Sequence, residues 1–227
     1  MKILAVADHI DPLVYSAGIK RRFADVDLVL GAGDLPMEYL GFISASLNKP
    51  IYFVFGNHHL KHLSRFRRWG VRTDAHRYAI SNTGIGDNYF GSTYVGSRVV
   101  CHDGLILAGL GGCKRYNKGE NQFTEWQLFK RILMMIPGLL FNRVFRGRAL
   151  DILLTHAPPF RINDRPDPTH EGFKVLRWFL RTFRPRYLLH GHIHLYDLNA
   201  DREKQYQGTT VINVYDHYVL DFEPVAQ

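Results

Sequence analysis

The sequence predicts an α/β fold in which short buried strands alternate with amphipathic helices. Apolar runs end in polar or glycine-rich turns, and segments with helical spacing of apolar residues follow them. The chain has 227 residues, of which 46% are hydrophobic and 22% are charged. These values are typical of a globular domain and exclude a disordered or fibrous chain.

The first quarter of the chain contains three predicted strands that end in polar residues. They are Ile3 to Ala7, Leu28 to Ala32 and Ile51 to Phe55, followed by Asp8-His9, Gly33-Asp34 and Gly56-Asn57-His58 respectively. A helix is predicted between the second and third strands, because apolar residues from Met37 to Leu47 recur at helical spacing. Ligands of open α/β sheets bind at the carboxyl ends of the strands, so we expect a site there.

The remainder of the chain predicts an antiparallel hairpin, a helical insertion and further strands. Residues 94–110 are typical of hairpin strands, and the insertion covers about residues 124–147, where Pro137-Gly138 is expected to divide it into a helical pair. Buried runs at 152–154 and 187–189 flank a helical stripe from Phe173 to Phe183. Runs at 211–214 and 218–222 are predicted to form a closing antiparallel pair.

The charge of the chain favours an anionic partner or substrate. The formal net charge is +8, which leaves nucleic acid, phosphorylated small molecules and anionic lipid open. Basic residues gather in three stretches, Lys61 to Arg77, Lys130 to Arg148 and Lys174 to Arg186. A solvated helix face is the simpler interpretation of each stretch.

No hydrophobic run reaches the roughly 20 residues that a membrane span needs, and the run that comes closest, Ile132 to Phe141 in the insertion, is interrupted by Pro137-Gly138. The insertion is expected either to lie on anionic lipid or to pack on its own domain or on a second subunit of a homo-oligomer. With two cysteines and no signal peptide, we expect a cytoplasmic protein with reduced thiols, peripheral to the membrane if the insertion binds lipid.

The predicted strand ends carry side chains that divalent metals bind. These residues are Asp8, Asp34, Asn57, His156, His192 and His194. Carboxylate, amide and imidazole groups together suit Mn, Fe, Zn or Ni, and the lack of cysteine argues against a thiolate site. Each residue alone would more often be a helix cap, a turn or a surface residue. Together they predict a metal centre.

In these motifs the sequence resembles the calcineurin-like metallophosphoesterase superfamily, whose order the pieces follow. The resemblance implies a four-layer α-β-β-α sandwich of two mixed sheets, as one domain over residues 1–227, with a dinuclear metal centre of two divalent metal ions. By position in the motifs, one ion would be held by Asp8, Asp34 and His194. The other would be held by Asn57, His156, His192 and the bridging Asp34.

The resemblance further implies hydrolysis of a phosphodiester or phosphomonoester by a metal-bridging hydroxide, with manganese among the candidate metals. The catalytic residue His58, adjacent to Asn57, is expected to assist the leaving oxygen. Arg115, in the glycine-rich segment 111–117, is a candidate substrate-binding residue, although the segment is equally typical of a hairpin exit. The polar loop after His156 lines the entrance or is simply solvated.

One position departs from the family pattern. The family has Asp-x-His after its first strand, whereas this chain has Ile10 in place of the histidine. We expect Asp11 to substitute as a ligand, ahead of His9 or a water. The departure keeps open a binding or scaffold protein of the same fold with weak or no catalysis. The basic stretches also keep open a nuclease.

Overall fold

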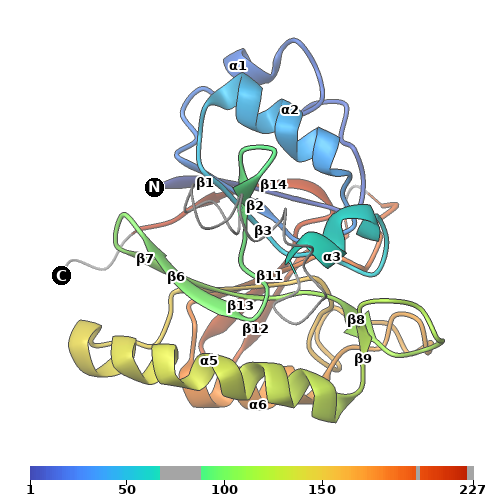
Figure 1. Ribbon diagram of the computed structural model, residues 1–227, viewed down its shortest axis with the longest axis vertical. Coiled ribbons are helices and arrows are strands. Elements are labelled where there is room, and N and C mark those ends of the chain that lie inside the picture. The colour runs from blue at the N-terminus through green and yellow to red at the C-terminus, as the bar shows by residue number, and fades with distance from the viewer. Residues whose placement is uncertain (67–87, 198–199, 224–227) are drawn as a thin grey trace, which may run out of the picture.

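The computed structural model describes residues 1–66, 88–197 and 200–223, so residues 67–77 of the first basic stretch lie outside the described chain. The described residues form four layers (Figure 1). Two six-stranded mixed sheets lie face to face in the middle, with helices on the outer side of each. The predicted α-β-β-α sandwich is confirmed.

The first sheet carries the amino-terminal strands in parallel. Its order is β14 (Asp216–Asp221), β1 (Lys2–Ala7), β2 (Leu28–Gly31), β3 (Ile51–Phe53), β5 (Ser92–Tyr94) and β4 (Asn88–Tyr89). The strands from β1 to β5 in this order run parallel, and β14 and β4 pair antiparallel at the two edges. The residues that follow β1, β2 and β3 therefore leave the sheet at the same edge.

The second sheet repeats this plan with carboxyl-terminal strands. Its order is β12 (Glu203–Tyr206), β13 (Thr209–Asn213), β11 (Tyr187–His190), β10 (Ile152–Thr155), β7 (Leu105–Leu110) and β6 (Arg98–His102). The four central strands run parallel between antiparallel edges. A small third sheet joins β8 (Cys113–Lys114) to β9 (Gln122–Phe123).

The predicted closing pair near the carboxyl terminus is wrong. β13 lies in the second sheet, and β14 pairs with β1 in the first, with Tyr218 opposite Ala5. This pairing joins residues more than two hundred positions apart, so local sequence spacing does not encode it. It places the residues around Asp216 beside the end of β1.

The strands are apolar on both faces because both faces are covered. In β1, Ile3 and Ala5 face the core between the sheets, whereas Leu4 and Val6 face the helices. Continuous apolar runs of this kind are typical of strands buried on both sides, and side chains alternate between the two faces along a strand.

On the first sheet lie α1 (Ile19–Arg22) and α2 (Met37–Leu47), and η1 (Leu60–His62) and α3 (Leu63–Phe66) follow β3. The helix predicted between the second and third strands is present as α2. It ends at Asn48, whose φ of 52° is left-handed, a conformation that asparagine adopts more easily than most residues.

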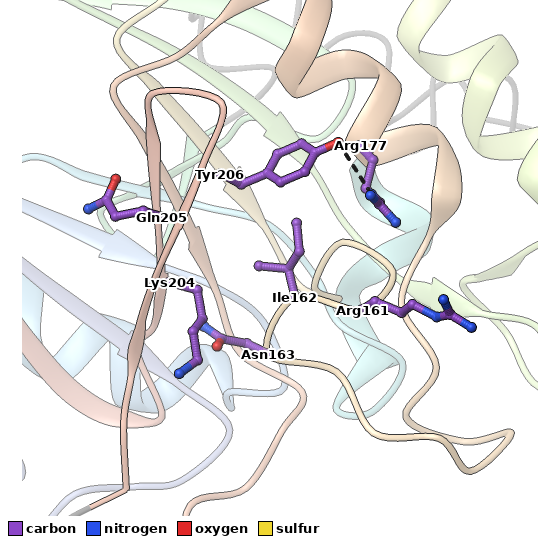
Figure 2. Close-up of a pocket in the computed structure, with 7 residues that line it drawn as sticks. All are labelled: Arg161, Ile162, Asn163, Arg177, Lys204, Gln205 and Tyr206. Atoms are coloured by element: carbon purple, nitrogen blue, oxygen red, sulfur yellow. Dashed lines mark hydrogen bonds between the residues drawn. The ribbon is translucent and has the colours of Figure 1, made fainter.

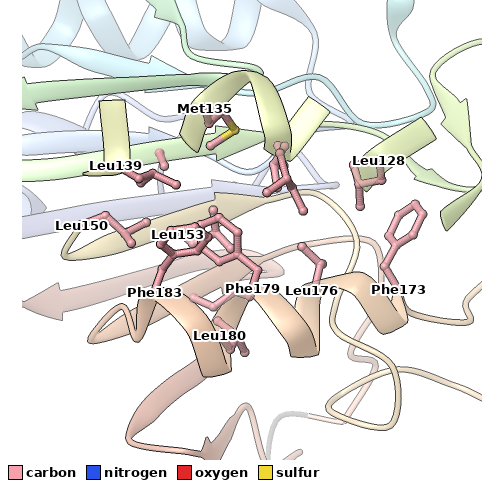
Figure 3. Packing of buried hydrophobic residues seen from close by; sticks show 14 of the residues in the cluster. Leu128, Met135, Leu139, Leu150, Leu153, Phe173, Leu176, Phe179, Leu180 and Phe183 are labelled. Atoms are coloured by element: carbon pink, nitrogen blue, oxygen red, sulfur yellow. The ribbon is translucent and has the colours of Figure 1, made fainter. Parts of the chain in front are cut away.

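On the second sheet lie α5 (Glu125–Arg146) and α6 (Lys174–Phe183), whose apolar side chains interdigitate with the strands (Figure 3). α5 is one continuous helix that contains Pro137, so the expected helical pair is wrong. Leu128 and Leu139, on either side of the proline, are both in the same buried cluster. None of the described helices combines the length and apolar content that a bilayer span requires.

Candidate metal centre

Side chains from the ends of both sheets meet at the seam between them. Asp34, His156 and His192 are buried and offer ligand atoms that all lie within 4.8 Å of one another. Nε2 of His156 lies 3.4 Å from Oδ2 of Asp34 and 3.1 Å from Oδ1 of Asn57. Four of the six strand-end residues predicted as ligands therefore lie close together.

The two imidazoles of this group each use one ring nitrogen to contact a backbone carbonyl. Nδ1 of His156 lies 2.9 Å from the oxygen of Ala32, and Nε2 of His192 lies 2.8 Å from that of Thr169. A carbonyl can only accept, so each contacting nitrogen carries the proton. In a neutral ring the other nitrogen has a lone pair that can bind a metal, as is usual for metal-binding histidines.

Three of the site residues have a left-handed backbone. The φ angles of Asp8, Asp34 and His192 are 66°, 55° and 69°. The N–H of His58 donates to Asp34 Oδ1 at 2.7 Å, and the N–H of His192 donates to the carboxylate of Asp8 at 2.9 Å. Such φ values cost energy in residues with a side chain, and they cluster at functional sites where the surroundings hold them in place.

Glycine is required where the strand ends approach one another. A Cβ on Gly56 would lie 2.0 Å from Oδ1 of Asp34, and a Cβ on Gly191 would lie 2.5 Å from Oδ2 of Asp8. Because these distances are far inside van der Waals contact, a side chain at either position would displace a carboxylate. This is the physical role of the glycines in the Gly-Asn-His and Gly-His-Ile-His motifs.

The electrostatics of the site are dominated by two carboxyl groups, Asp8 and Asp34, that are buried close together. Burial raises the pKa of Asp8 to about 7, and the carboxyl of Asp34 adds to this effect. Burial also acts to raise the pKa of Asp34, but the adjacent His156 holds it below its ordinary value. Burial lowers the pKa of His192 to about 3, so this ring is neutral at pH 7.

His156 balances this charge. Burial opposes protonation of His156, yet Asp34 and Asp8 outweigh it and raise its pKa to about 9. In the described part of the chain, the ion-pair partner of both carboxylates is this histidine and not a lysine or arginine. A divalent cation fits a site with two carboxylates, an amide oxygen and two imidazoles, and it would take over the role of the proton on His156.

Asp8 and His194 lie beside the group of four, outside the set of residues whose ligand atoms come together. Oδ1 of Asp8 is 3.9 Å from Nδ1 of His156. The ring of His194 packs against that of Tyr215 with centroids 5.0 Å apart, and its Nδ1 is 3.3 Å from the hydroxyl of Tyr196. Both would complete the half of the centre that the resemblance assigns to the other ion.

His9 and Asp11, which flank Ile10, contact residues outside the cluster. The carboxylate of Asp11 accepts from the N–H of Leu13 and pairs with the ring of His217 on β14. His9 contacts Asp216, with 2.7 Å between Nδ1 and Oδ1. The structure therefore brings neither Asp11 nor His9 to the cluster, because the carboxyl-terminal strand β14 provides a partner for each.

Arg115 is also held away from the cluster. Its guanidinium donates to the carbonyl of Gln122 and to Oε1 of Gln127, at the start of α5. The neighbouring Tyr116 reaches the site instead, with its hydroxyl 3.4 Å from Nδ2 of Asn57. Asn121 supports the same loop by donating to the carbonyls of Phe55 and Gly56. The sequence pointed to segment 111–117 as a whole. It did not predict these contacts, because they join segments that are distant in sequence.

The residues of the polar loop after His156 lie in two separate places. Asp167 orients His170, whose ring centroid is 5.5 Å from that of His192, so this part borders the cluster. Arg161 instead lines a separate hollow of about 400 Å³ between the loop, α6 and β12 (Figure 2). There Arg177 donates to the hydroxyl of Tyr206. Asp164 accepts from the N–H of Gly172 and supports the loop.

Comparisons with known proteins agree with this geometry. A family model described as calcineurin-like phosphoesterase matches residues 1–196. No curated protein matches the chain. One solved structure has 14% identity and a TM-score of 0.62, with 97% of this chain and 94% of the other covered. The structure of TT1561 from Thermus thermophilus has 13% identity and a TM-score of 0.53, with 95% and 89% covered. At these identities the structural matches show the fold alone.

Proposed function

The chain belongs to the calcineurin-like phosphoesterase family, and from this premise we propose that it hydrolyses phosphate esters with divalent metal ions held at the seam. The observation that carries the proposal is the arrangement around His156. One ring nitrogen is fixed by a carbonyl, and the other faces oxygens of Asp34 and Asn57. An imidazole surrounded by oxygen donors in this way is typical of a metal ligand.

In this proposal Asp34, Asn57, His156 and His192 hold one ion, and Asp8 and His194 contribute with Asp34 to a second. Bound ions of this kind stabilise charge on a phosphoryl group and make a bound water more acidic. The protein positions these ligands through the carbonyls of Ala32 and Thr169. His58 is exposed beside them, where its ring can give a proton to a leaving oxygen.

The engagement of Asp11 by His217 supports unequal sites. Without a ligand from position 10 or 11, an ion at Asp8 and His194 would have fewer protein ligands than an ion at His156. We therefore expect one tightly held ion per chain and a second that needs added metal. Both phosphodiesters and phosphomonoesters are candidate substrates of the protein in this proposal.

The test combines metal analysis with hydrolysis of an aryl phosphodiester and an aryl phosphomonoester, with and without added manganese. We expect the purified protein to hold divalent metal and manganese to stimulate hydrolysis. His156→Ala should lose both the metal and roughly 10²-fold or more of the rate. His102→Ala, on β6 in the same sheet, is the matched control and should retain both.

Two outcomes would contradict the proposal in different ways. Protein without bound metal and without hydrolysis at any added metal would favour the scaffold alternative. Hydrolysis unaffected by His156→Ala would place the chemistry elsewhere. Binding of DNA or RNA that weakens steeply with salt would favour the nuclease alternative over a small phosphate ester.

A further inference from the structure

The outward side of helix α5 is apolar. The opposite side packs on the second sheet through residues such as Leu128, Ile132 and Leu139. On the side that faces solvent, surface helices normally expose polar residues. We call the following exposed residues the outer face of α5, and each is between 41% and 75% exposed: Trp126, Leu133, Met134, Leu140, Phe141, Val144 and Phe145.

The outer face extends along most of the helix, from Trp126 to Phe145. α5 has 22 residues, which corresponds to about 33 Å at 1.5 Å per residue. The rings of Phe141 and Phe145 are 4.5 Å apart near one end, and those of Trp126 and Phe129 are 5.4 Å apart near the other. Single exposed apolar residues are ordinary, but a connected apolar strip marks an interaction surface.

The two helices that cover the second sheet are strongly cationic. The helices α5 and α6 together carry seven lysines and arginines and one acid, Glu125. Glu125 is occupied at the start of α6, where it accepts from the N–H groups of Lys174 and Val175. The seven cations are Lys130, Arg131, Arg143, Arg146, Lys174, Arg177 and Arg181.

The charge of α5 and α6 distinguishes between two candidates that could cover the outer face of α5, a second copy of the chain and a lipid surface. In a two-fold dimer the same patch meets itself, so the cations of one copy would approach the cations of the other. The two helices offer no free acid to pair with them. An anionic lipid surface provides the complementary charge, and its headgroup region accepts both tryptophan and the apolar strip.

We propose that the outer face of α5 docks on an anionic lipid bilayer. The helix lies in the plane of the headgroups, with Leu140, Phe141 and Val144 directed into the acyl boundary. Lys130 and Arg143 reach the lipid phosphates, since long basic side chains extend their charge to the headgroups. This interaction is independent of hydrolysis at the metal centre.

Vesicle sedimentation tests the proposal. The full chain should bind vesicles of equal phosphatidylcholine and phosphatidylglycerol, bind phosphatidylcholine vesicles at least tenfold more weakly, and dissociate as salt rises. Phe141→Ser with Phe145→Ser should weaken binding at least tenfold. Lys130→Gln with Arg143→Gln should weaken it roughly 25-fold, because each cation near an anionic surface contributes about fivefold.

Matched controls lie on the opposite layer, where α1 is found in Figure 1. Lys20→Gln with Arg21→Gln removes the same charge from α1, and Leu13→Ser removes an exposed apolar side chain. Both should bind anionic vesicles like the unchanged protein. Thermal unfolding followed by circular dichroism confirms that each variant is folded.

Three results would overturn the proposal. The first is no binding to anionic vesicles, and the second is equal binding to both vesicle types. The third is a dimer in analytical ultracentrifugation that the Phe141→Ser and Phe145→Ser variant dissociates, without vesicle binding. That last result would identify a second copy of the chain as the occupant.

Discussion

His58 is the residue on which the proposed chemistry depends most directly outside the ligands. Its backbone N–H holds Asp34, while its side chain is exposed next to Asn57. We expect His58→Ala to slow ester hydrolysis about 10²-fold, the usual contribution of a general acid, with bound metal retained because the N–H remains. Hydrolysis and metal content are measured on the same sample.

The control for this change is His59→Ala, an exposed histidine one position further. It should leave the rate within about twofold, since general-acid assistance requires a group within hydrogen-bond reach of the leaving oxygen. An equal loss in both variants would point to a disturbed loop and not to a role of His58. Loss of metal in His58→Ala would lead to the same conclusion.

The two cysteines are expected to differ in their reactivity toward alkylating reagents. Cys101 is exposed, whereas burial raises the pKa of the Cys113 thiol to about 12, with Asp34 adding to the effect. Thiolates and not thiols react with iodoacetamide. At pH 8 the native protein should therefore label rapidly at one cysteine per chain, and at both after denaturation. Mass spectrometry locates the label, and rapid native labelling of Cys113 would disprove its burial.

The same thiol gives a pH dependence with a defined sign. In the folded chain the Cys113 thiol stays protonated up to about pH 12, whereas in the unfolded chain it releases its proton from about pH 9. The unfolded state then binds fewer protons over this window, so the free energy of unfolding falls as pH rises. Urea unfolding should show a smaller fall in Cys113→Ala than in the unchanged protein.

The sequence was sufficient to predict which residues lie at the site, but not which residues contact them in the folded chain. The strand-end residues Asp34, Asn57, His156 and His192 could be predicted because each follows a recognisable apolar run. Asp11 could not be excluded as a ligand from the sequence. Its partner His217 comes from β14, whose position beside β1 depends on a long-range pairing.

At the scale of elements, α5 shows where local rules fail. Proline removes a backbone N–H and disfavours a helix interior, and this rule predicted a break at Pro137. The helix continues because buried residues on both sides, including Ile132 and Leu139, pack on the same sheet. Its ends follow local rules, with a capping box at Thr124 and a left-handed Gly147.

Pro137 should therefore cost stability without shaping the fold. We expect Pro137→Ala to raise the free energy of unfolding by about 1 to 3 kcal/mol, because alanine restores a helical N–H and relieves the ring contact. Pro36→Ala is the control, since Pro36 precedes α2 and no helical hydrogen bond is missing there. Urea unfolding measures both, and a less stable Pro137→Ala would show that the proline supports the helix.

At the scale of the molecule, the site depends on the association of the two sheets. Asp34 and Asn57 follow strands of the first sheet, whereas His156 and His192 follow strands of the second. The two packed sheets were expected only because the motifs resemble those of the family. Which sheet each carboxyl-terminal strand joins could not be predicted, because strand pairing across the chain has no local signal.

A centre shared between two sheets should couple metal binding to global stability. A ligand that binds only the folded state at 100 times its dissociation constant adds about 2.7 kcal/mol to the free energy of unfolding. For a chain of this size that corresponds to roughly 5 to 10 °C in Tm. We expect a chelator to lower the Tm by this amount and added manganese or zinc to restore it. His192→Ala should abolish the response, and His102→Ala should retain it. A shift of equal size in His192→Ala would mean that the metal stabilises the protein from a site outside the seam.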